Sequence, residues 1–192
     1  MTTPRILALA GSARKDSLNK KLLAIAVEGA RREGAEVTVA DLREWPMPLY
    51  DGDLEAEQGL PDTVRRFKAL LKEHQGLLLA CPEYNSSITP LLKNTIDWCT
   101  RAEPGEKPLA AFDGKVAGLV AASPGALGGL RGLVVVRMLL GNIRVHVLPE
   151  QVAVPQAQRA FDADGRLTDD KRRAAVEALG VRLAQVVARL QA

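Results

Sequence analysis

The stretch ILALAGSARKDSLN, residues 6–19, decides the fold of this chain. Its first five residues, 6–10, are all apolar and are followed by a glycine, which is typical of a β-strand covered on both faces. A polar loop comes next, and Leu18, Leu22 and Ile25 then recur at helical spacing. A strand, a loop and a helix in this order favour a sheet with helices on its faces.

The same alternation continues along the chain. Further strands are predicted at residues 37–40, 76–81, 116–122 and 144–148, and a last helix is predicted to open at Thr168. The segments between strands are about 20 to 35 residues long, which suits a helical crossover and not a hairpin. We therefore expect an α/β fold with a five-stranded, doubly wound parallel sheet and helices on both faces, in a single domain of residues 1–192.

Two segments carry more specific expectations. The stretch 45–61 is rich in proline and acidic residues and is interpreted as one long surface loop. Residues 91–98 are expected to form a helix that packs on the sheet, with Trp98 in the core.

Composition excludes several classes of protein. With 47% hydrophobic and 26% charged residues among 192, the chain is not disordered as a whole. No apolar run approaches the roughly 18 residues of a membrane span, and the start of the chain lacks a signal peptide, so a cytoplasmic protein without a membrane partner is expected. The net charge of +3 comes from interspersed residues, which argues against nucleic acid as a partner.

The cysteines and histidines predict neither a disulfide nor a metal site. Cys81 and Cys99 are interpreted as packed thiols, because structural disulfides are rare in cytoplasmic proteins. His74 and His146 do not lie at metal-ligand spacing from a cysteine or carboxylate, so no metal is expected.

The loop after the first strand favours an anion. It offers the hydroxyls of Ser12 and Ser17, the Arg14 guanidinium and the Asn19 amide beside the free N–H groups of a helix start. Gly11 is its only glycine, so the dinucleotide and triphosphate patterns are absent, and a terminal phosphomonoester fits better. The alternative is an ordinary capped helix with solvated cations.

Two further loops are expected at the same edge of the sheet, because carboxyl ends of parallel strands meet there. After the third strand come Pro82, Glu83, Tyr84 and Asn85, whose backbone groups suit a planar heterocycle, unless Asn85 merely closes a turn. After the fourth strand, Ser123 and the Gly125 backbone close the site, unless these glycines only form turns.

The segment that follows, residues 130–140, is strongly apolar, and its valine run is compatible with either a helix or a strand. So much apolar surface suggests packing against another subunit, and hence a homo-oligomer.

Three stretches together resemble the NADPH-dependent FMN reductase family, which includes quinone, azo and chromate reductases of flavodoxin-like fold. They are GSARKDSLNKKLL (11–23), PEYNSSITPLLKNTIDW (82–98) and ASPGALGGLR (122–131). The resemblance implies the strand order 2-1-3-4-5. It also implies three groups of FMN contacts: the phosphate on Ser12, Arg14, Ser17 and Asn19; the ring and ribityl chain on Pro82, Glu83, Tyr84 and Asn85; and the other side of the ring on Ser123 and Gly125.

The resemblance further implies hydride transfer from NADPH or NADH to the flavin, and then electron transfer to a small acceptor such as a quinone, an azo compound or a metal oxyanion. Because this chemistry belongs to the cofactor, no catalytic side chain is assigned. A homodimer or homotetramer is expected. Beyond about residue 150 no motif is found, so no function is carried over there.

Two other functions stay open at this stage. A flavodoxin-type electron carrier would bind FMN and dock to proteins without turning over small molecules. A Rossmann-type NAD enzyme is motivated by Asp41 at the end of the second strand, where a ribose-binding acid can sit, although the glycines it needs are missing.

Overall fold

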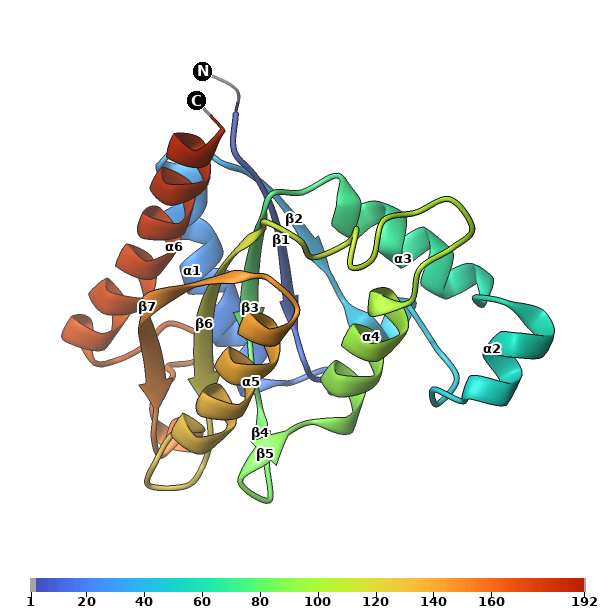
Figure 1. Cartoon of the computed structure of the whole chain (residues 1–192). Coiled ribbons are helices and arrows are strands. Elements are labelled where there is room, and N and C mark those ends of the chain that lie inside the picture. The colour runs from blue at the N-terminus through green and yellow to red at the C-terminus, as the bar shows by residue number, and fades with distance from the viewer. Residues whose placement is uncertain (1–2, 192) are drawn as a thin grey trace.

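The computed structural model describes residues 3–191, and its centre is a sheet of five strands (Figure 1). Side by side they run β2 (Glu36–Ala40), β1 (Arg5–Ala10), β3 (Gly76–Ala80), β6 (Val116–Ala122) and β7 (His146–Val154). All neighbouring pairs are parallel. Numbered along the chain, these five strands have the order 2-1-3-4-5, so the predicted doubly wound sheet is confirmed.

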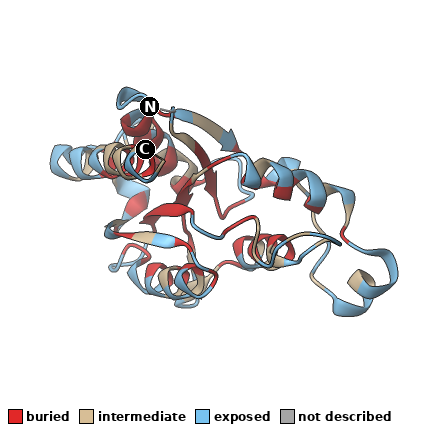
Figure 2. Ribbon diagram, turned by 45° about the horizontal axis from the view of Figure 1, so that its top comes forward, coloured by how far each residue is buried: buried red, intermediate tan, exposed pale blue. Residues whose placement is uncertain are grey.

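Helices cover both faces of this sheet (Figures 1 and 2). One face carries α1 (Leu18–Arg32) and α6 (Asp170–Leu190), and the other carries α3 (Asp62–Lys72), α4 (Pro90–Thr100) and α5 (Leu130–Asn142). Alternate side chains of β1 enter the two cores, which explains why the strand is a continuous apolar run. No helix within residues 3–191 has both the length and the apolarity needed to cross a membrane.

The packing of α1 on α6 depends on two glycines. A Cβ atom on Gly29 would lie 2.1 Å from the carbonyl oxygen of Glu177, and one on Gly180 would lie 2.0 Å from that of Ala26. Real Cβ atoms do not approach so closely, so the two helix backbones touch directly at positions where no side chain stands between them.

The fifth strand differs from its prediction. It was expected at residues 144–148, but β7 begins at His146 and continues to Val154. Its register shifts between Ala117 and Leu119 of β6, and Pro149 lies in the bulge. A proline lacks the N–H of a regular ladder but is tolerated in an edge-strand bulge, which is why the run looked shorter in the sequence.

Two expectations for the connecting segments also change. The predicted loop 45–61 contains a helix, α2 (Gly52–Gln58), which begins where the Asp51 carboxylate accepts a hydrogen bond from the Asp53 N–H at 2.9 Å. No residue of α2 is buried, so the apolar period that marks a helix is missing. The ambiguous segment 130–140 is helical and forms most of α5. Trp98 is fully buried, as predicted.

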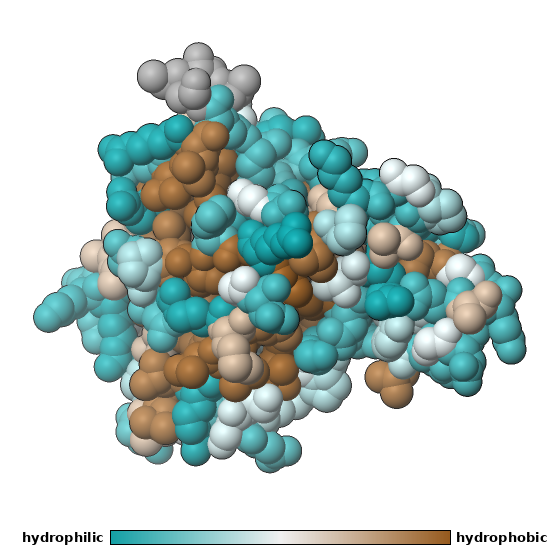
Figure 3. Space-filling model, in the orientation of Figure 1, coloured by the Kyte–Doolittle hydropathy of each residue, from teal (hydrophilic) through white to brown (hydrophobic). Residues whose placement is uncertain are grey.

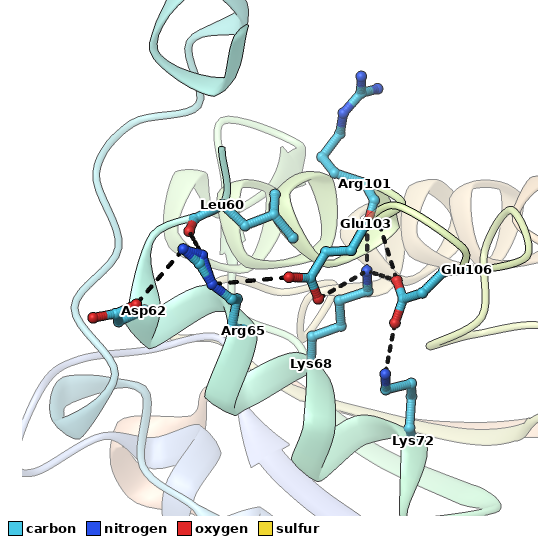
Figure 4. Close-up of polar contacts among 8 residues, drawn as sticks. All are labelled: Leu60, Asp62, Arg65, Lys68, Lys72, Arg101, Glu103 and Glu106. Carbon is cyan, nitrogen blue, oxygen red and sulfur yellow. Dashed lines mark hydrogen bonds and ion pairs between the residues drawn. The ribbon is translucent and has the colours of Figure 1, made fainter. Parts of the chain in front are cut away.

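A buried lysine fixes the segment after α4 to α3 (Figure 4). Lys68 is 1% exposed, and its ammonium donates to the Arg101 carbonyl oxygen at 2.6 Å and to the Glu106 carboxylate. Glu106 also accepts a hydrogen bond from Lys72 at 2.6 Å. The hydrogen bonds from Lys68 and Lys72 lower the pKa of Glu106 to about 2, because they stabilise its charged form.

The contact between α1 and α6 predicts that Gly180→Ala lowers the free energy of unfolding by at least about 2 kcal/mol, because the added methyl group overpacks a backbone contact. Gly141→Ala is the matched control, since nothing lies within 4 Å of its Cβ position in α5. That variant should be neutral or slightly stabilising. Urea unfolding of both variants checks this, and equal stabilities would contradict it.

The cluster formed by Lys68, Lys72 and Glu106 predicts that the free energy of unfolding depends on pH. Because the pKa of Glu106 is lowered from 4.5 to about 2, its contribution is present above pH 4.5 and is lost as the pH falls from there toward 2. Glu106→Gln should remove this part of the pH dependence and cost about 3 kcal/mol at pH 7, because Lys68 stays buried without its nearer counter-ion.

Glu103→Gln is the control for that substitution, since the Glu103 carboxylate lies 4.0 Å from the Lys68 ammonium and should matter less. Chemical denaturation at a series of pH values makes the comparison. Parallel stability curves for the wild type and Glu106→Gln would show that the cluster does not act in this way.

Candidate functional site

The loop between β1 and α1 presents a helix start to the carboxyl edge of the sheet. Gly11 lies against α4, where a Cβ atom would be 2.9 Å from Cβ of Leu92, and its carbonyl oxygen accepts a hydrogen bond from the Thr89 hydroxyl at 2.8 Å. Ser17 has the extended backbone of an N-cap, but its hydroxyl makes no capping bond. The first-turn N–H groups of α1 therefore stay available for a ligand.

Asn19 ties this helix start to the third loop. Its carboxamide donates to the Ala122 carbonyl oxygen at 2.8 Å and accepts from the Ala122 N–H at 2.9 Å. Asn19 is only 5% exposed. One amide N–H is left for the phosphate contact that the resemblance implies, so the main observed contact of this side chain is structural.

The second loop is a small β-hairpin, which was not predicted from the sequence. Strand β4 (Glu83–Tyr84) pairs antiparallel with β5 (Ser87–Ile88), and Asn85 and Ser86 form the turn with φ of 50° and 67°. Positive φ at both central residues is the geometry of a two-residue type I′ turn, for which asparagine is a favoured residue. The Glu83 carboxylate turns toward α5 and accepts hydrogen bonds from Arg131 and from the Gly132 N–H.

The third loop, residues 123–129, is held by the chain beyond β7. The Ser123 carbonyl oxygen accepts from the Ala157 N–H at 3.0 Å, and the Gly125 carbonyl oxygen accepts from the Gln156 N–H at 3.2 Å. A Cβ atom on Gly128, whose φ is +64°, would lie 2.6 Å from the backbone nitrogen of Pro155. The segment after residue 150 thus supports the site, although no motif there pointed to it.

The three loops line one cleft, called here the three-loop cleft. Eight of the ten predicted residues border it, and Asn85 and Gly125 do not. The cleft is also lined by three residues that were not predicted from the sequence: Leu18, Ala122 and Pro124. Each of them is adjacent in the chain to a predicted residue. The lining residues are Ser12, Arg14, Ser17, Leu18, Asn19, Pro82, Glu83, Tyr84, Ala122, Ser123 and Pro124.

The charge at the cleft is positive on the side of α1. Arg14 is exposed there, and no carboxylate among residues 3–191 forms an ion pair with it. A guanidinium and a helix N-terminus both attract an anion, so this side of the cleft suits a phosphate.

Asp41, in contrast, is already engaged. Burial acts to raise its pKa, but hydrogen bonds from the Lys20 side chain and the Arg43 N–H bring the pKa of Asp41 below its ordinary value. The Lys20 ammonium lies 2.6 Å from the Asp41 carboxylate. A carboxylate held in this way has a structural partner, which weakens its interpretation as a ribose-binding acid.

The sequence of this chain matches one family model and several named proteins. The sequence model of the family described as NADPH-dependent FMN reductase matches residues 4–159. A protein named NAD(P)H-dependent FMN reductase, from Pseudomonas aeruginosa, is 39% identical over 174 residues, which cover 90% of this chain and 89% of that protein. A probable NADPH:quinone oxidoreductase 2 from Oryza sativa is 30% identical and covers 97% of this chain and 90% of its own.

A solved structure is similar over nearly the whole chain. The flavoenzyme NAD(P)H:(acceptor) oxidoreductase FerB from Paracoccus denitrificans superposes with a TM-score of 0.78 at 27% identity, covering 97% of this chain and 98% of its own. The match of the family model to most of the chain, together with these relatives, shows that this chain belongs to the NADPH-dependent FMN reductase family.

Proposed function

We propose that this chain uses NAD(P)H to reduce a quinone, with FMN bound in the three-loop cleft as its cofactor. Membership of the NADPH-dependent FMN reductase family supports the class of reaction. The observation that carries the proposal is the convergence of an uncapped helix start, Arg14 and two flanking loops on one cleft at the carboxyl edge of the sheet.

The α1 side of the cleft fits the phosphate end of FMN. Ser12 and Ser17 bring hydroxyls to it, and the Arg14 N–H donates to the Ser12 hydroxyl at 3.3 Å, which holds the loop in a turn. A dianionic phosphate at this helix N-terminus would gain about 0.3 to 2 kcal/mol from the helix dipole. Arg14 adds a charge-assisted hydrogen bond.

The remaining sides fit the ring end. Pro82 and Tyr84 come from the hairpin, and Ser123 and Pro124 from the third loop, so a planar heterocycle has a wall on each side. Tyr84 is 52% exposed, which leaves an aromatic surface open to a second molecule. Asn85 and Gly125 would act through the backbone shape of their loops.

The size of the cleft decides how much of the cofactor it encloses. Its volume is about 90 Å³, whereas sites that enclose a whole drug-sized ligand measure roughly 300 Å³ or more. The cleft therefore suits one end of a mononucleotide, with the rest lying along its rim. An open ring face is what a reductase needs if two substrates are to reach the same cofactor.

When bound, FMN supplies the redox chemistry by taking two electrons from NAD(P)H and passing them to the acceptor. The protein's part is to bind, orient and expose it, so no nucleophile is required. The cysteines agree with this: burial raises the pKa of both Cys81 and Cys99 to about 12, so neither thiol ionises near neutral pH.

Quinones are proposed as acceptors because the Oryza relative carries that activity in its name. Azo compounds and metal oxyanions remain comparison substrates. An FMN-binding electron carrier would use the same cleft but would not turn over small molecules, so the assay below also separates these two functions.

The proposed function predicts that the purified protein binds FMN and oxidises NADPH or NADH when a quinone is added. Arg14→Ala should weaken FMN binding by about 1.5 to 3 kcal/mol, because a hydrogen bond to a charged group is lost. Calorimetric titration with FMN and a quinone-dependent NAD(P)H assay measure the two effects.

Lys15→Ala is the matched control, because Lys15 is an exposed cation of the same loop that does not line the cleft. It should leave FMN affinity nearly unchanged. Equal losses in both variants would contradict the role of Arg14. FMN binding without quinone turnover would favour the electron carrier, and no FMN binding would overturn the proposal.

We also propose that the protein is a homo-oligomer, with α5 in the interface. Leu130, Val134 and Met138 follow one another at four-residue spacing and are 42%, 60% and 69% exposed. Figure 3 shows apolar side chains gathered on the face of the molecule where α5 lies. An exposed apolar stripe of this kind is typical of a surface that a second copy covers.

The proposed interface predicts that the wild type sediments as a dimer or a larger assembly. Val134→Glu should shift it toward the monomer by at least about tenfold in dissociation constant, since it buries a charge in an apolar contact. Leu190→Glu is the control, because Leu190 is also exposed but lies at the end of α6. This variant should leave the dissociation constant unchanged. Sedimentation velocity tests this, and a monomeric wild type would refute it.

A further inference from the structure

Glu83 makes an unusual contact for a residue at the edge of a ligand cleft. Its side chain is 9% exposed, and its carboxylate lies at the N-terminus of α5. One oxygen accepts a hydrogen bond from the Gly132 N–H at 2.8 Å, and the other accepts from Arg131 Nη2 at 3.1 Å and Nε at 3.3 Å. Both oxygens are therefore used by α5.

The start of α5 has a shape and an electrostatic character that suit this carboxylate. The N-cap is Gly129, which has no side chain to cap the helix, and the first turn contains no acidic residue. Glu83 from the hairpin thus provides the negative charge that a helix N-terminus favours. A Cβ atom on Gly132 would lie only 3.2 Å from Cβ of Glu83, so the helix approaches closely because this position is a glycine.

The contact also fixes the hairpin. Glu83 stands between Pro82 and Tyr84, which both line the three-loop cleft. Strand β4 has just two residues and is paired only with the equally short β5, so its own ladder gives it little rigidity. The hydrogen bonds from Arg131 and the Gly132 N–H to Glu83 tie the strand that contains Tyr84 to α5.

We propose that Glu83 is a positioning residue, which sets the ring-facing backbone of the hairpin by anchoring it to α5. This inference rests on the proposed binding of FMN in the three-loop cleft. It assigns the side chain a role different from the direct flavin contact implied by the resemblance, while the backbone of Glu83 stays available to the cofactor.

The role predicts a graded effect of substitution. Glu83→Ala should weaken FMN binding by about tenfold or more, as expected for the loss of hydrogen bonds to a charged group. It should also change the visible circular dichroism of the bound flavin, which reports the surroundings of the ring. Glu83→Gln should keep most of the FMN affinity and most of the wild-type circular dichroism, because its amide oxygen can still accept from the Gly132 N–H.

Two further variants separate positioning from general stability. Asp169→Ala removes the carboxylate that caps α6, which accepts from the Arg172 N–H at 3.1 Å and does not line the cleft. It should lower the free energy of unfolding but leave the flavin spectrum unchanged. Arg131→Ala removes one of the two partners of Glu83, and the Arg131 side chain is the more exposed of the pair. This variant should change the flavin spectrum in the same direction as Glu83→Ala, but by a smaller amount.

The experiment is calorimetric titration with FMN, visible circular dichroism at saturating FMN and urea unfolding of the full chain and its variants. Should Glu83→Ala not fold, Arg131→Ala and Glu83→Gln carry the test. An unchanged flavin spectrum in Glu83→Ala or Arg131→Ala, or a Glu83→Gln spectrum as altered as that of Glu83→Ala, overturns the positioning role. Failure of the wild type to bind FMN would instead overturn the proposed function itself.

Discussion

The double hydrogen bond between the Asn19 carboxamide and the backbone of Ala122 is the constraint on which the site depends. It joins residues 103 positions apart, one in the first turn of α1 and the other at the end of β6. Losing it would leave buried backbone groups without partners, which is costly. The helix start that faces the proposed phosphate and the loop that faces the proposed ring are therefore held as one rigid unit.

The other walls of the cleft are fixed in similar ways. The hairpin is anchored to α5 through Glu83, and the third loop is anchored to the segment after β7 through the Gln156 and Ala157 N–H groups. A site that binds a redox cofactor needs shape and charge more than reactive side chains, since the cofactor supplies the chemistry. The buried, protonated Cys81 next to the cleft is consistent with that division of labour.

Much of the fold was predictable because the central strands are covered on both faces. Every residue of β3 and β6 is buried, so each strand is a continuous apolar run. Prediction failed where this signal weakens: β7 is an edge strand with an exposed Pro149 in a bulge, and α2 buries no residue at all. The β4–β5 hairpin was not predicted because a strand of two residues is too short to show an alternation of apolar and polar residues.

Most residues that line the three-loop cleft were predictable for a topological reason, since parallel strands bring the loops after them to one edge. The contacts that these residues make were not predictable. The partners of Asn19 and Glu83 lie 103 and 49 positions away, and no local pattern shows that an amide will close on β6 or that a carboxylate will cap a distant helix. Asn85 and Gly125 were selected with their neighbours, but neither is among the residues that line the cleft.

The most direct test of this account is a crystal structure of the protein grown with FMN. The account predicts electron density for the phosphate at the first turn of α1, within hydrogen-bond distance of Arg14 and Ser17, and for the ring between Tyr84 and Ser123. A flavin bound anywhere else on the protein would contradict it.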